Sequence, residues 1–321
     1  MSEFVNEAYR DAAIKSADRL FPLDRAAKLQ IDFKRVFSTH LGHLIGGGYF
    51  EADGLLITGQ SGSGKTTETR SLLKRFNADA VELPNGMPAR IAECSLKGIG
   101  TWKDLGKSSS KAVGYPISEK ARLNQSEIWD VVIREAKLAG VMGIHFDEVQ
   151  HIFREKSRKE CLALLDSFKS LMKTHDWPLM LIFSGVPELD EYMRIEPQVY
   201  TRLERVPFEE IAPTVDYKTV HEIIGSYGIF AGLEVDQDLM TQDFLSRLVT
   251  AGAYRWGLVI KLTKMATTAA QDAGASRLTR DHFVEVWVNK TKVAKLATPF
   301  LHSGFETMYR KEHPFIEAFA D

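Results

Sequence analysis

The residues best suited to chemistry stand together in the run GQSGSGKTT, at positions 59–67. Small side chains leave the backbone bare there, so successive N–H groups can turn inward and hold phosphate oxygens. The run matches the pattern G-x-x-x-x-G-K-[ST], after an apolar stretch and before a helical one. In this pattern Lys65 reaches the β- and γ-phosphates of a nucleotide, and the Thr66 hydroxyl holds Mg²⁺. The predicted phosphate site consists of Gly59, Gln60, Ser61, Gly62, Ser63, Gly64, Lys65, Thr66 and Thr67.

A second group of reactive side chains follows the apolar run GVMGIHF, at positions 140–146. Asp147 and Glu148 come directly after this run, and ligands of open α/β sheets collect at the carboxyl ends of strands. We expect Asp147 to contact Mg²⁺, directly or through its hydration shell, and Glu148 to polarise a water for attack on a γ-phosphate. A solvated acidic pair at a strand end is the alternative. Beside a phosphate loop, the pair favours hydrolysis of a nucleoside triphosphate.

Four further side chains are candidates for the same chemistry. Ser184 ends another apolar run, where its hydroxyl could orient the attacking water or simply form a turn. Arg202 and Arg205 stand in VYTRLERVPF, and an arginine there could reach the γ-phosphate of a neighbouring subunit. A surface salt bridge is the alternative for these two. Arg255 is expected at the start of a later helix, from which it could close over the phosphates and bind the nucleotide.

The elements that position these residues alternate along the chain. Short apolar runs at 54–59, 89–96, 140–148, 178–185 and 204–211 predict five strands, and helices are expected at 24–45, 66–76, 125–138 and 158–174. This alternation predicts an α/β fold with a five-stranded parallel sheet covered on both faces. After Pro213 the pattern becomes helical throughout. We therefore divide the chain into an N-terminal helical entry segment (1–50), an α/β domain (51–211), a small all-helical lid (212–290) and a tail (291–321).

The composition excludes several classes of protein. The 321 residues carry a formal net charge of −2, so any surface that binds nucleic acid must be local. No apolar run approaches the roughly 20 residues that span a bilayer, and the N-terminus lacks the apolar core of a signal peptide. Cys94 and Cys161 lie far apart without metal-ligand spacing, and buried, reduced thiols are the expectation. A cytoplasmic protein without a membrane partner is predicted.

These features, in this order, resemble the P-loop AAA+ ATPases over roughly residues 24–290. The resemblance rests on GQSGSGKT, GIHFDE, the strand-end Ser184, TRLERV and the GAYR arginine. Within that superfamily the chain looks most like the TniB/TnsC group of transposition regulators. The segments FPLDRAAKLQIDF, FDEVQHIF, SGVPELDEY and TRLERVPFEEI carry this finer resemblance.

The resemblance implies an ATP-dependent ring or helical oligomer that assembles on duplex DNA and links a TniQ-like target-selection protein to a DDE-type transposase. Hydrolysis of ATP, with Mg²⁺, would control disassembly. Arg202 matches the arginine-finger position, with Arg205 as the other candidate, and Arg255 matches the sensor-2 position. Other DNA-associated AAA+ ATPases, such as replication initiators or helicase loaders, share much of the pattern and remain alternatives. A nucleotide-gated scaffold without DNA contact remains another.

One local excess of positive charge is a candidate for DNA contact. In a helix capped by Thr101, the side chains of Lys103, Lys107 and Lys111 would lie on one stripe, about 6 Å apart along the axis. This spacing is close to that between phosphates on one DNA strand, and Thr101 with the serines at 108–110 would supply further donors. Because no array of aromatic or amide side chains suggests base reading, contact independent of sequence is expected. A solvated lysine face is the alternative.

The tail contains several aromatic residues among charges of both signs, namely Phe300, Phe305, Tyr309, Phe315 and Phe319. Exposed aromatic side chains in such a segment are typical of a peptide that docks on a partner. Packing of the tail back onto the lid is the alternative.

Overall fold

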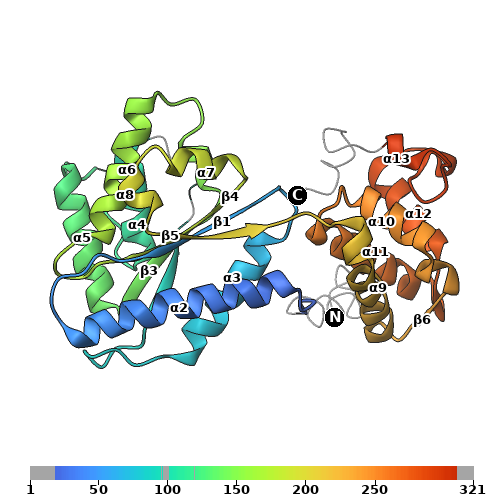
Figure 1. Ribbon diagram of the computed structural model, residues 1–321, viewed down its shortest axis with the longest axis horizontal. Coiled ribbons are helices and arrows are strands. Elements are labelled where there is room, and N and C mark those ends of the chain that lie inside the picture. Colours follow the sequence, from blue (N-terminus) through green and yellow to red (C-terminus); the bar gives the residue numbers. More distant parts are fainter. Residues whose placement is uncertain (1–18, 95, 97–100, 119, 309–321) are drawn as a thin grey trace.

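The computed structural model describes residues 19–94, 96, 101–118 and 120–308. Figure 1 shows two lobes side by side, an α/β lobe and a helical lobe. Within the described residues, the polypeptide passes between the lobes in two places: from the last strand of the sheet into the helical lobe, and through the segment that precedes the first described helix. Each lobe has a hydrophobic core of its own.

The α/β lobe is built on the predicted parallel sheet. Its strands are β1 (Gly54–Gly59), β2 (Arg90–Cys94), β3 (Val141–Phe146), β4 (Met180–Gly185) and β5 (Leu203–Phe208). They pair in the order β2-β3-β4-β1-β5, and every pair is parallel. β3 and β4 are buried at every position, which explains why both read as unbroken apolar runs. The predicted α/β fold with a five-stranded parallel sheet is confirmed.

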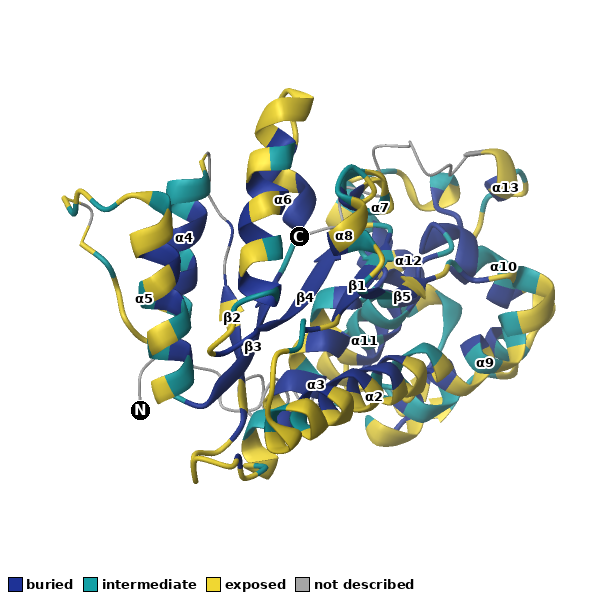
Figure 2. Cartoon of the chain, turned by 60° about the vertical axis from the view of Figure 1, so that its left-hand side comes forward, coloured by how far each residue is buried: buried dark blue, intermediate teal, exposed yellow. Residues whose placement is uncertain are grey.

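Helices cover both faces of this sheet (Figure 2). α2 (Asp24–Gly46) and α3 (Lys65–Asp79) pack together on one face. The other face carries α5 (Gln125–Leu138), α6 (Arg158–Met172), α7 (Glu188–Met193) and α8 (Pro197–Tyr200), with α4 (Trp102–Ala112) against α5 at the β2 edge. Thr101, Asn124 and Ser157 each accept from the backbone three residues on, so capping boxes fix where α4, α5 and α6 begin.

The helical lobe follows β5. It contains α9 (Pro213–Phe230), α10 (Gln242–Ala251), α11 (Trp256–Asp272), α12 (Arg280–Thr291) and α13 (Phe305–Met308), with short 3₁₀ turns at Gln237–Met240 and Lys295–Ala297. The expectation of an entirely helical lid needs one correction. Two strands of two residues each, β6 (Glu234–Val235) and β7 (Arg277–Leu278), form a parallel pair there. Strands this short show no alternation of apolar and polar residues in the sequence.

The segment before α2 belongs to the helical lobe. Leu23 is buried in that lobe's core, and the Arg19 guanidinium donates to the Ser226 hydroxyl at 2.8 Å and lies over the Phe230 ring. From Leu29 onward, the apolar side chains of α2 pack into the core of the α/β lobe instead. Residues 19–29 therefore connect the two lobes, and the segment packs on the helical lobe at Leu23 and on the α/β lobe from Leu29.

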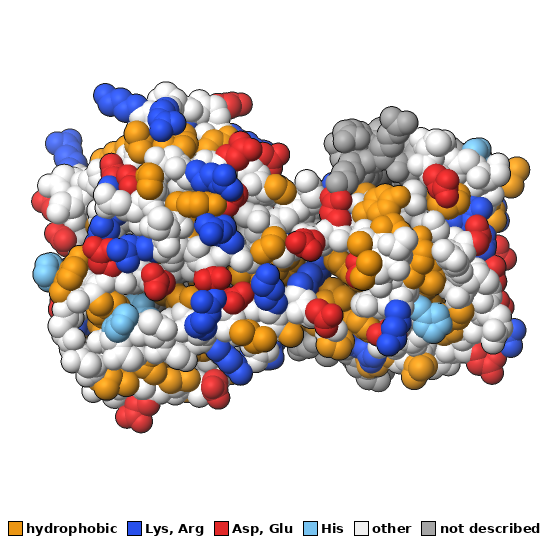
Figure 3. All heavy atoms as spheres, in the orientation of Figure 1, with side chains coloured by type: hydrophobic (Ala, Val, Ile, Leu, Met, Phe, Trp, Pro, Cys, Tyr) orange, Lys and Arg blue, Asp and Glu red, His pale blue; other side chains and the backbone are white. Residues whose placement is uncertain are grey.

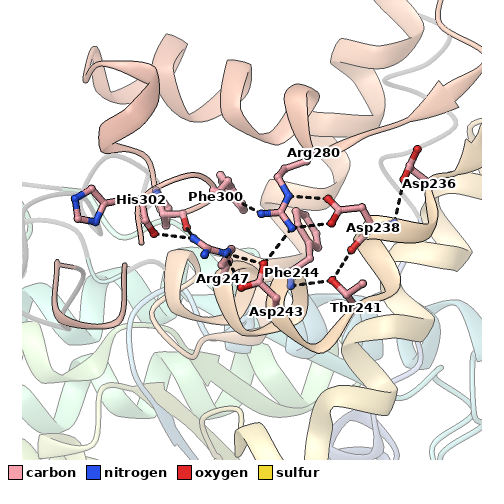
Figure 4. A network of polar contacts seen from close by, with 10 residues as sticks. Asp236, Asp238, Thr241, Asp243, Phe244, Arg247, Arg280, Phe300 and His302 are labelled. Carbon is pink, nitrogen blue, oxygen red and sulfur yellow. Dashed lines mark hydrogen bonds and ion pairs between the residues drawn. The ribbon is translucent and has the colours of Figure 1, made fainter. Parts of the chain in front are cut away.

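The first part of the C-terminal tail packs on the helical lobe (Figure 4). Arg247 donates to the carbonyl oxygens of Pro299 and His302, and Arg280 donates to that of Phe300. The Phe300 ring is fully buried. Of the two possibilities for the tail, docking on a partner or packing onto the lid, the structure shows the second for residues up to 308. Tyr309, Phe315 and Phe319 lie outside the described residues.

The surface matches the near-neutral composition. Figure 3 shows basic and acidic side chains interspersed over the face in view, without one large field of a single sign. Over the described residues, every helix is too short or too polar to traverse a lipid bilayer. Cys94 and Cys161 are both buried free thiols, as predicted, and burial raises the pKa of Cys94 to about 12.

Candidate nucleotide-binding site

The glycine-rich loop between β1 and α3 forms a phosphate cradle. Gly62 and Gly64 have φ angles of 76° and 100°, in the left-handed region that favours glycine. Gly64 is the N-cap of α3, so the positive end of that helix faces the loop. An added Cβ at Gly59 would lie 2.8 Å from Phe208, so this position also requires glycine. The geometry fits the binding of phosphate groups by backbone N–H groups.

Lys65 stands at the mouth of this cradle. Its ammonium donates to the carbonyl oxygens of Gly59, at 2.8 Å, and Gln60, at 3.1 Å. The side chain is almost fully buried, and this burial lowers the pKa of Lys65, an effect that the charges of Glu148 and Asp147 oppose. A desolvated ammonium beside bare backbone is suited to bind an anion strongly.

Asp147 lies next to Thr66, as the sequence predicts for a Mg²⁺ site. Its Oδ1 accepts from the Thr66 hydroxyl at 3.3 Å, the Ser184 hydroxyl at 2.6 Å and the Glu148 N–H at 3.1 Å. Among the described residues, no cluster of three or more His, Cys, Asp or Glu could hold a metal ion. Mg²⁺ is commonly bound through one or two oxygen ligands together with substrate phosphates, so a hydroxyl and a carboxylate at this distance fit it.

Glu148 is held in an unusual backbone conformation. Its φ of 54° lies in the left-handed region, which is rare for a residue with a side chain and is frequent at functional sites. The Gln150 amide donates to Glu148 Oε2, and Gln150 Oε1 accepts from the Val186 N–H. Gln150 is buried and was not among the predicted site residues. Through these two contacts, Gln150 ties the carboxylate of the predicted base to the backbone that follows β4.

Ser184 and His145 form a buried pair behind Asp147. Ser184 Oγ lies 2.9 Å from His145 Nε2, and both side chains are essentially inaccessible to solvent. Burial lowers the pKa of His145 to about 4, so its imidazole is neutral at pH 7. The role of Ser184 in orienting a water stays a prediction, because its hydroxyl donates to Asp147 in the structure. Sequence reasoning missed His145, which reads as one more residue of an apolar strand.

The helical lobe closes directly onto the phosphate loop. Arg255 is the N-cap residue of α11, and its Nη1 donates to the Ser61 carbonyl at 2.7 Å. A Cβ added at Gly257 would lie only 2.4 Å from the Gly62 carbonyl oxygen. Ala253 and Tyr254, in the turn before α11, have φ angles of 49° and 61°. The backbone is thus strained at Ala253 and Tyr254, directly before Arg255, which contacts the phosphate loop.

Arg25, in the first turn of α2, is a further residue of this site. Its guanidinium donates to the Ser63 carbonyl at 2.6 Å and to Glu68 Oε1 at 2.7 Å. It also lies over the rings of Phe208 and Trp256, so it contacts the phosphate loop, α3, β5 and α11 together. No local spacing indicated this role, because Glu68 is 43 residues further along the chain.

A cavity of about 570 Å³ opens beside Arg25, between the lobes. The segment before α2, the end of β5 and the first turns of α9 and α11 line it, through residues that include Phe21, Arg25, Pro207, Glu210, Asp216 and Trp256. Aromatic and charged side chains line this cavity, and its volume lies in the range of small-molecule sites. Arg25, which lines the cavity, also donates to the Ser63 carbonyl of the phosphate loop, and its guanidinium lies over the ring of Trp256, another lining residue.

Arg202 and Arg205 lie away from this site. The Gly54 N–H, at the start of β1, donates to the Arg202 carbonyl, so Arg202 stands at the edge of the sheet opposite the phosphate loop. The length of β1, about 16 Å, separates the two edges. Arg202 forms an ion pair with Glu51, and the exposed Arg205 lies over the Tyr200 ring at 4.9 Å. Neither arginine reaches the phosphate loop of its own chain.

The helix predicted for the lysine stripe is confirmed as α4, with Thr101 as its N-cap. Lys103 and Lys107 are partly exposed and Lys111 is exposed, on the side away from the buried Leu105. The Thr101 hydroxyl already donates to Asp104 at 2.8 Å. The expectation that the whole serine triplet offers donors to DNA is wrong: the hydroxyls of Ser109 and Ser110 are buried and donate to the carbonyls of Leu105 and Tyr115.

Comparisons with known proteins agree with this geometry. Residues 50–193 match the model of the AAA domain family. The comparison with curated proteins gave no match. Among solved structures, the chain is similar to the ORC1 protein of Aeropyrum pernix in complex with DNA, with 16% identity and a TM-score of 0.60 over 87% of this chain and 68% of that one.

Two other solved structures share the architecture. Cdc6p of Pyrobaculum aerophilum gives 11% identity and a TM-score of 0.58 over 82% of this chain and 66% of that chain. The Thermotoga maritima RuvB Holliday junction branch migration motor gives 12% identity and a TM-score of 0.50, covering 88% and 73%. At these identities the likeness shows the fold, and the chain spans about two thirds of the length of the ORC1 and Cdc6p proteins. Residues 50–193 are therefore similar to the AAA domain family, and the chain has the AAA+ fold of ORC1 and Cdc6p.

Proposed function

We propose that this chain, with its AAA-type P-loop domain, is a Mg²⁺-dependent ATPase whose protomers assemble through their nucleotide sites on duplex DNA. One observation carries the proposal. Lys65, Thr66, Asp147 and Glu148 converge at one edge of the sheet, whereas Arg202 lies at the opposite edge. The chain has the parts of a triphosphate site, and the predicted finger can complete that site only in a neighbouring protomer.

Within one protomer, the loop N–H groups and Lys65 hold the phosphates, and the cavity beside Arg25 accommodates the base and ribose. Thr66 and Asp147 would hold Mg²⁺, which when bound neutralises charge on the β- and γ-phosphates. Glu148 accepts a proton from the attacking water, and Gln150 keeps the carboxylate aimed. Arg255 joins the helical lobe to the same loop, so nucleotide occupancy sets the angle between lobes.

Arg202 completes the site in trans. Its guanidinium stands at the surface with its side chain 29% exposed, held by Glu51 and ready to meet a neighbour. A positive charge delivered there stabilises the charge that develops on the transferred phosphoryl group. Bound ATP then joins protomers into a ring or helical oligomer, and slow hydrolysis limits its lifetime.

DNA contact is proposed for α4. The three lysines on its outer side would each meet a backbone phosphate, and each protomer alone would bind weakly. Many protomers along one duplex would bind well because their contacts act together. The similarity of the fold to ORC1, which was solved in complex with DNA, supports a DNA-associated role.

We propose regulation of DNA transposition as the specific role, on the strength of the motifs shared with the TniB/TnsC group. In that role the oligomer links a TniQ-like target selector to a DDE-type transposase. Replication initiation or helicase loading is the second candidate, favoured by the fold shared with ORC1 and Cdc6p. A matching transposase pulled down with the ATP-bound oligomer supports the first role, and a replicative helicase supports the second.

The test of the shared proposal is assembly on DNA. Sedimentation with ATP, Mg²⁺ and a random-sequence duplex should give large complexes, and omission of ATP should leave protomers. Changing Lys103, Lys107 and Lys111 together to glutamate should abolish DNA binding but leave nucleotide binding intact. The matched control reverses the charges of Lys290, Lys292 and Lys295, which are exposed on the helical lobe, and should bind DNA normally. Protomers that stay single with ATP and DNA present would rule the proposal out.

A further inference from the structure

The buried pair His145 and Ser184 has a fixed direction of hydrogen bonding. The Ser184 hydroxyl has one proton, and its shortest contact is the 2.6 Å distance to Asp147 Oδ1. An ionised carboxylate only accepts, so the serine must be the donor there. His145 Nε2, at 2.9 Å from Ser184 Oγ, must then donate to the serine oxygen. Nε2 therefore carries a proton, whatever the charge of the ring.

The arrangement of the strands makes this chain of bonds possible. His145 and Asp147 are two residues apart along β3 and its end, so their side chains share one face of the sheet. β4 lies beside β3 with Phe183 opposite Phe146, which brings Ser184 level with Asp147. His145 is 1% exposed and Ser184 is fully buried, so water does not compete for these bonds. The two hydrogen bonds therefore link His145, inside the sheet, through Ser184 to the carboxylate of Asp147 at the proposed Mg²⁺ site.

Without the histidine, the serine hydroxyl would have a second choice. Its Oγ also lies 3.5 Å from the Phe146 carbonyl, which could accept the same proton. Donation from His145 occupies the oxygen from the other side and leaves the hydroxyl directed at Asp147. Asp147 Oδ1 then has three donors, and its orientation toward the phosphate loop is fixed.

We propose that His145 is a positioning residue that acts through Ser184 to orient Asp147 for the metal-bound nucleotide. The inference rests on the proposed ATPase function. It assigns to a residue of the β3 core a part in metal and nucleotide binding, without any contact between His145 and the substrate.

The first test is spectroscopic and needs no activity. ¹⁵N NMR of histidine-labelled full-length protein, with the His145 signals assigned by their loss in His145→Gln, reports which ring nitrogen carries the proton. We expect Nε2 to carry a proton. A proton on Nδ1 with Nε2 bare would overturn the proposal, whatever the protein does with ATP.

The second test uses Mn²⁺ as the probe, with ADP present and its binding followed by electron paramagnetic resonance. His145→Leu should weaken Mn²⁺ binding about tenfold, the range found when partners of metal ligands are removed, and leave ADP affinity without metal unchanged. His145→Gln keeps an N–H donor at nearly the same reach and should bind Mn²⁺ like wild type. Equal loss in both variants, or none in His145→Leu, would contradict the proposal.

A double variant shows whether the histidine acts through the serine. His145→Leu combined with Ser184→Ala should bind Mn²⁺ no more weakly than Ser184→Ala alone, because both changes interrupt one chain of bonds. Additive losses would mean that the two residues act separately and would refute the proposal. Wild-type protein that binds ADP and Mn²⁺ yet hydrolyses no ATP would refute the ATPase function instead, so the two failures are distinguishable.

Discussion

Arg255 Nη1, in the helical lobe, donates a hydrogen bond of 2.7 Å to the carbonyl oxygen of Ser61 in the phosphate loop. This bond joins the two lobes at the point where the triphosphate would bind. It depends on close approach of α11, which is possible because residue 257 has no side chain.

Gly257→Ala should separate α11 from the phosphate loop. Its Cβ would lie 2.4 Å from the Gly62 carbonyl oxygen, in backbone that cannot yield without moving the helix. We expect ATP affinity to fall at least about tenfold and stability to fall by about 1–3 kcal/mol. The control is Gly225→Ala in α9, where an added Cβ meets nothing within 4 Å and a gain of about 0.5–1 kcal/mol is expected. Calorimetric titration with ATP would compare them, and equal affinities would refute the proposed contact.

Arg25→Met should destabilise the α/β lobe by about 3 kcal/mol, because it leaves the Glu68 carboxylate buried without its cation. Changing Glu68 to methionine as well should recover at least half of that loss, since the buried charge is then removed. Urea unfolding measures both values. If the double variant loses the sum of the two single effects, Arg25 and Glu68 do not act as a pair.

Acidification should destabilise the protein through His40. Its ring packs against Phe50, both ring nitrogens lack hydrogen-bond partners among the described residues, and burial lowers the pKa of His40 from 6.5 to about 4. Between those values the unfolded chain takes up a proton that the folded chain does not, so stability falls as the pH falls. From pH 7.5 to 5.0, His40→Phe should lose about 2 kcal/mol less than wild type in urea unfolding. His221→Phe, an exposed control on α9, should follow wild type; a parallel fall in His40→Phe would contradict this.

Arg280 should hold the tail on the helical lobe (Figure 4). It binds Asp238 through two hydrogen bonds, Asp243 through one and the Phe300 carbonyl through one. Arg280→Met should therefore destabilise the lobe by about 2 kcal/mol and speed proteolysis near residue 300. Arg277→Met nearby removes only exposed ion pairs, with Glu234 and Asp236, and should change neither the stability of the lobe nor the proteolysis rate measurably. Equal proteolysis rates in the two variants would show that Arg280 does not clamp the tail.

The sequence predicted those parts of the site that consecutive residues build. The phosphate loop, the Asp147–Glu148 pair and the order of helices and strands follow from local patterns of glycine, charge and hydrophobic period. Arg25, Gly257 and His145 could not be found in this way. Each acts through partners at least 38 residues away, so its role appears only when the fold brings them together.

The lysine stripe on α4 also shows which features local sequence predicts and which it does not. Its helix and its N-cap Thr101 were predicted, because a threonine that precedes a helical spacing of side chains is a local pattern. The burial of the neighbouring serines was not predicted, because the packing of α4 against α5 decides which side chains are buried. Local sequence therefore located the element and left its buried face undetermined.

The most direct test of the account mixes two inactive variants. Lys65→Ala lacks the phosphate-binding lysine, and Arg202→Ala lacks the finger that a neighbour should supply. If each site is completed by the next protomer, an equal mixture should regain about a quarter of wild-type ATPase activity on duplex DNA, because one pairing in four combines both intact residues. Full activity in Arg202→Ala alone, or a mixture as inactive as its parts, would contradict a nucleotide site shared between protomers.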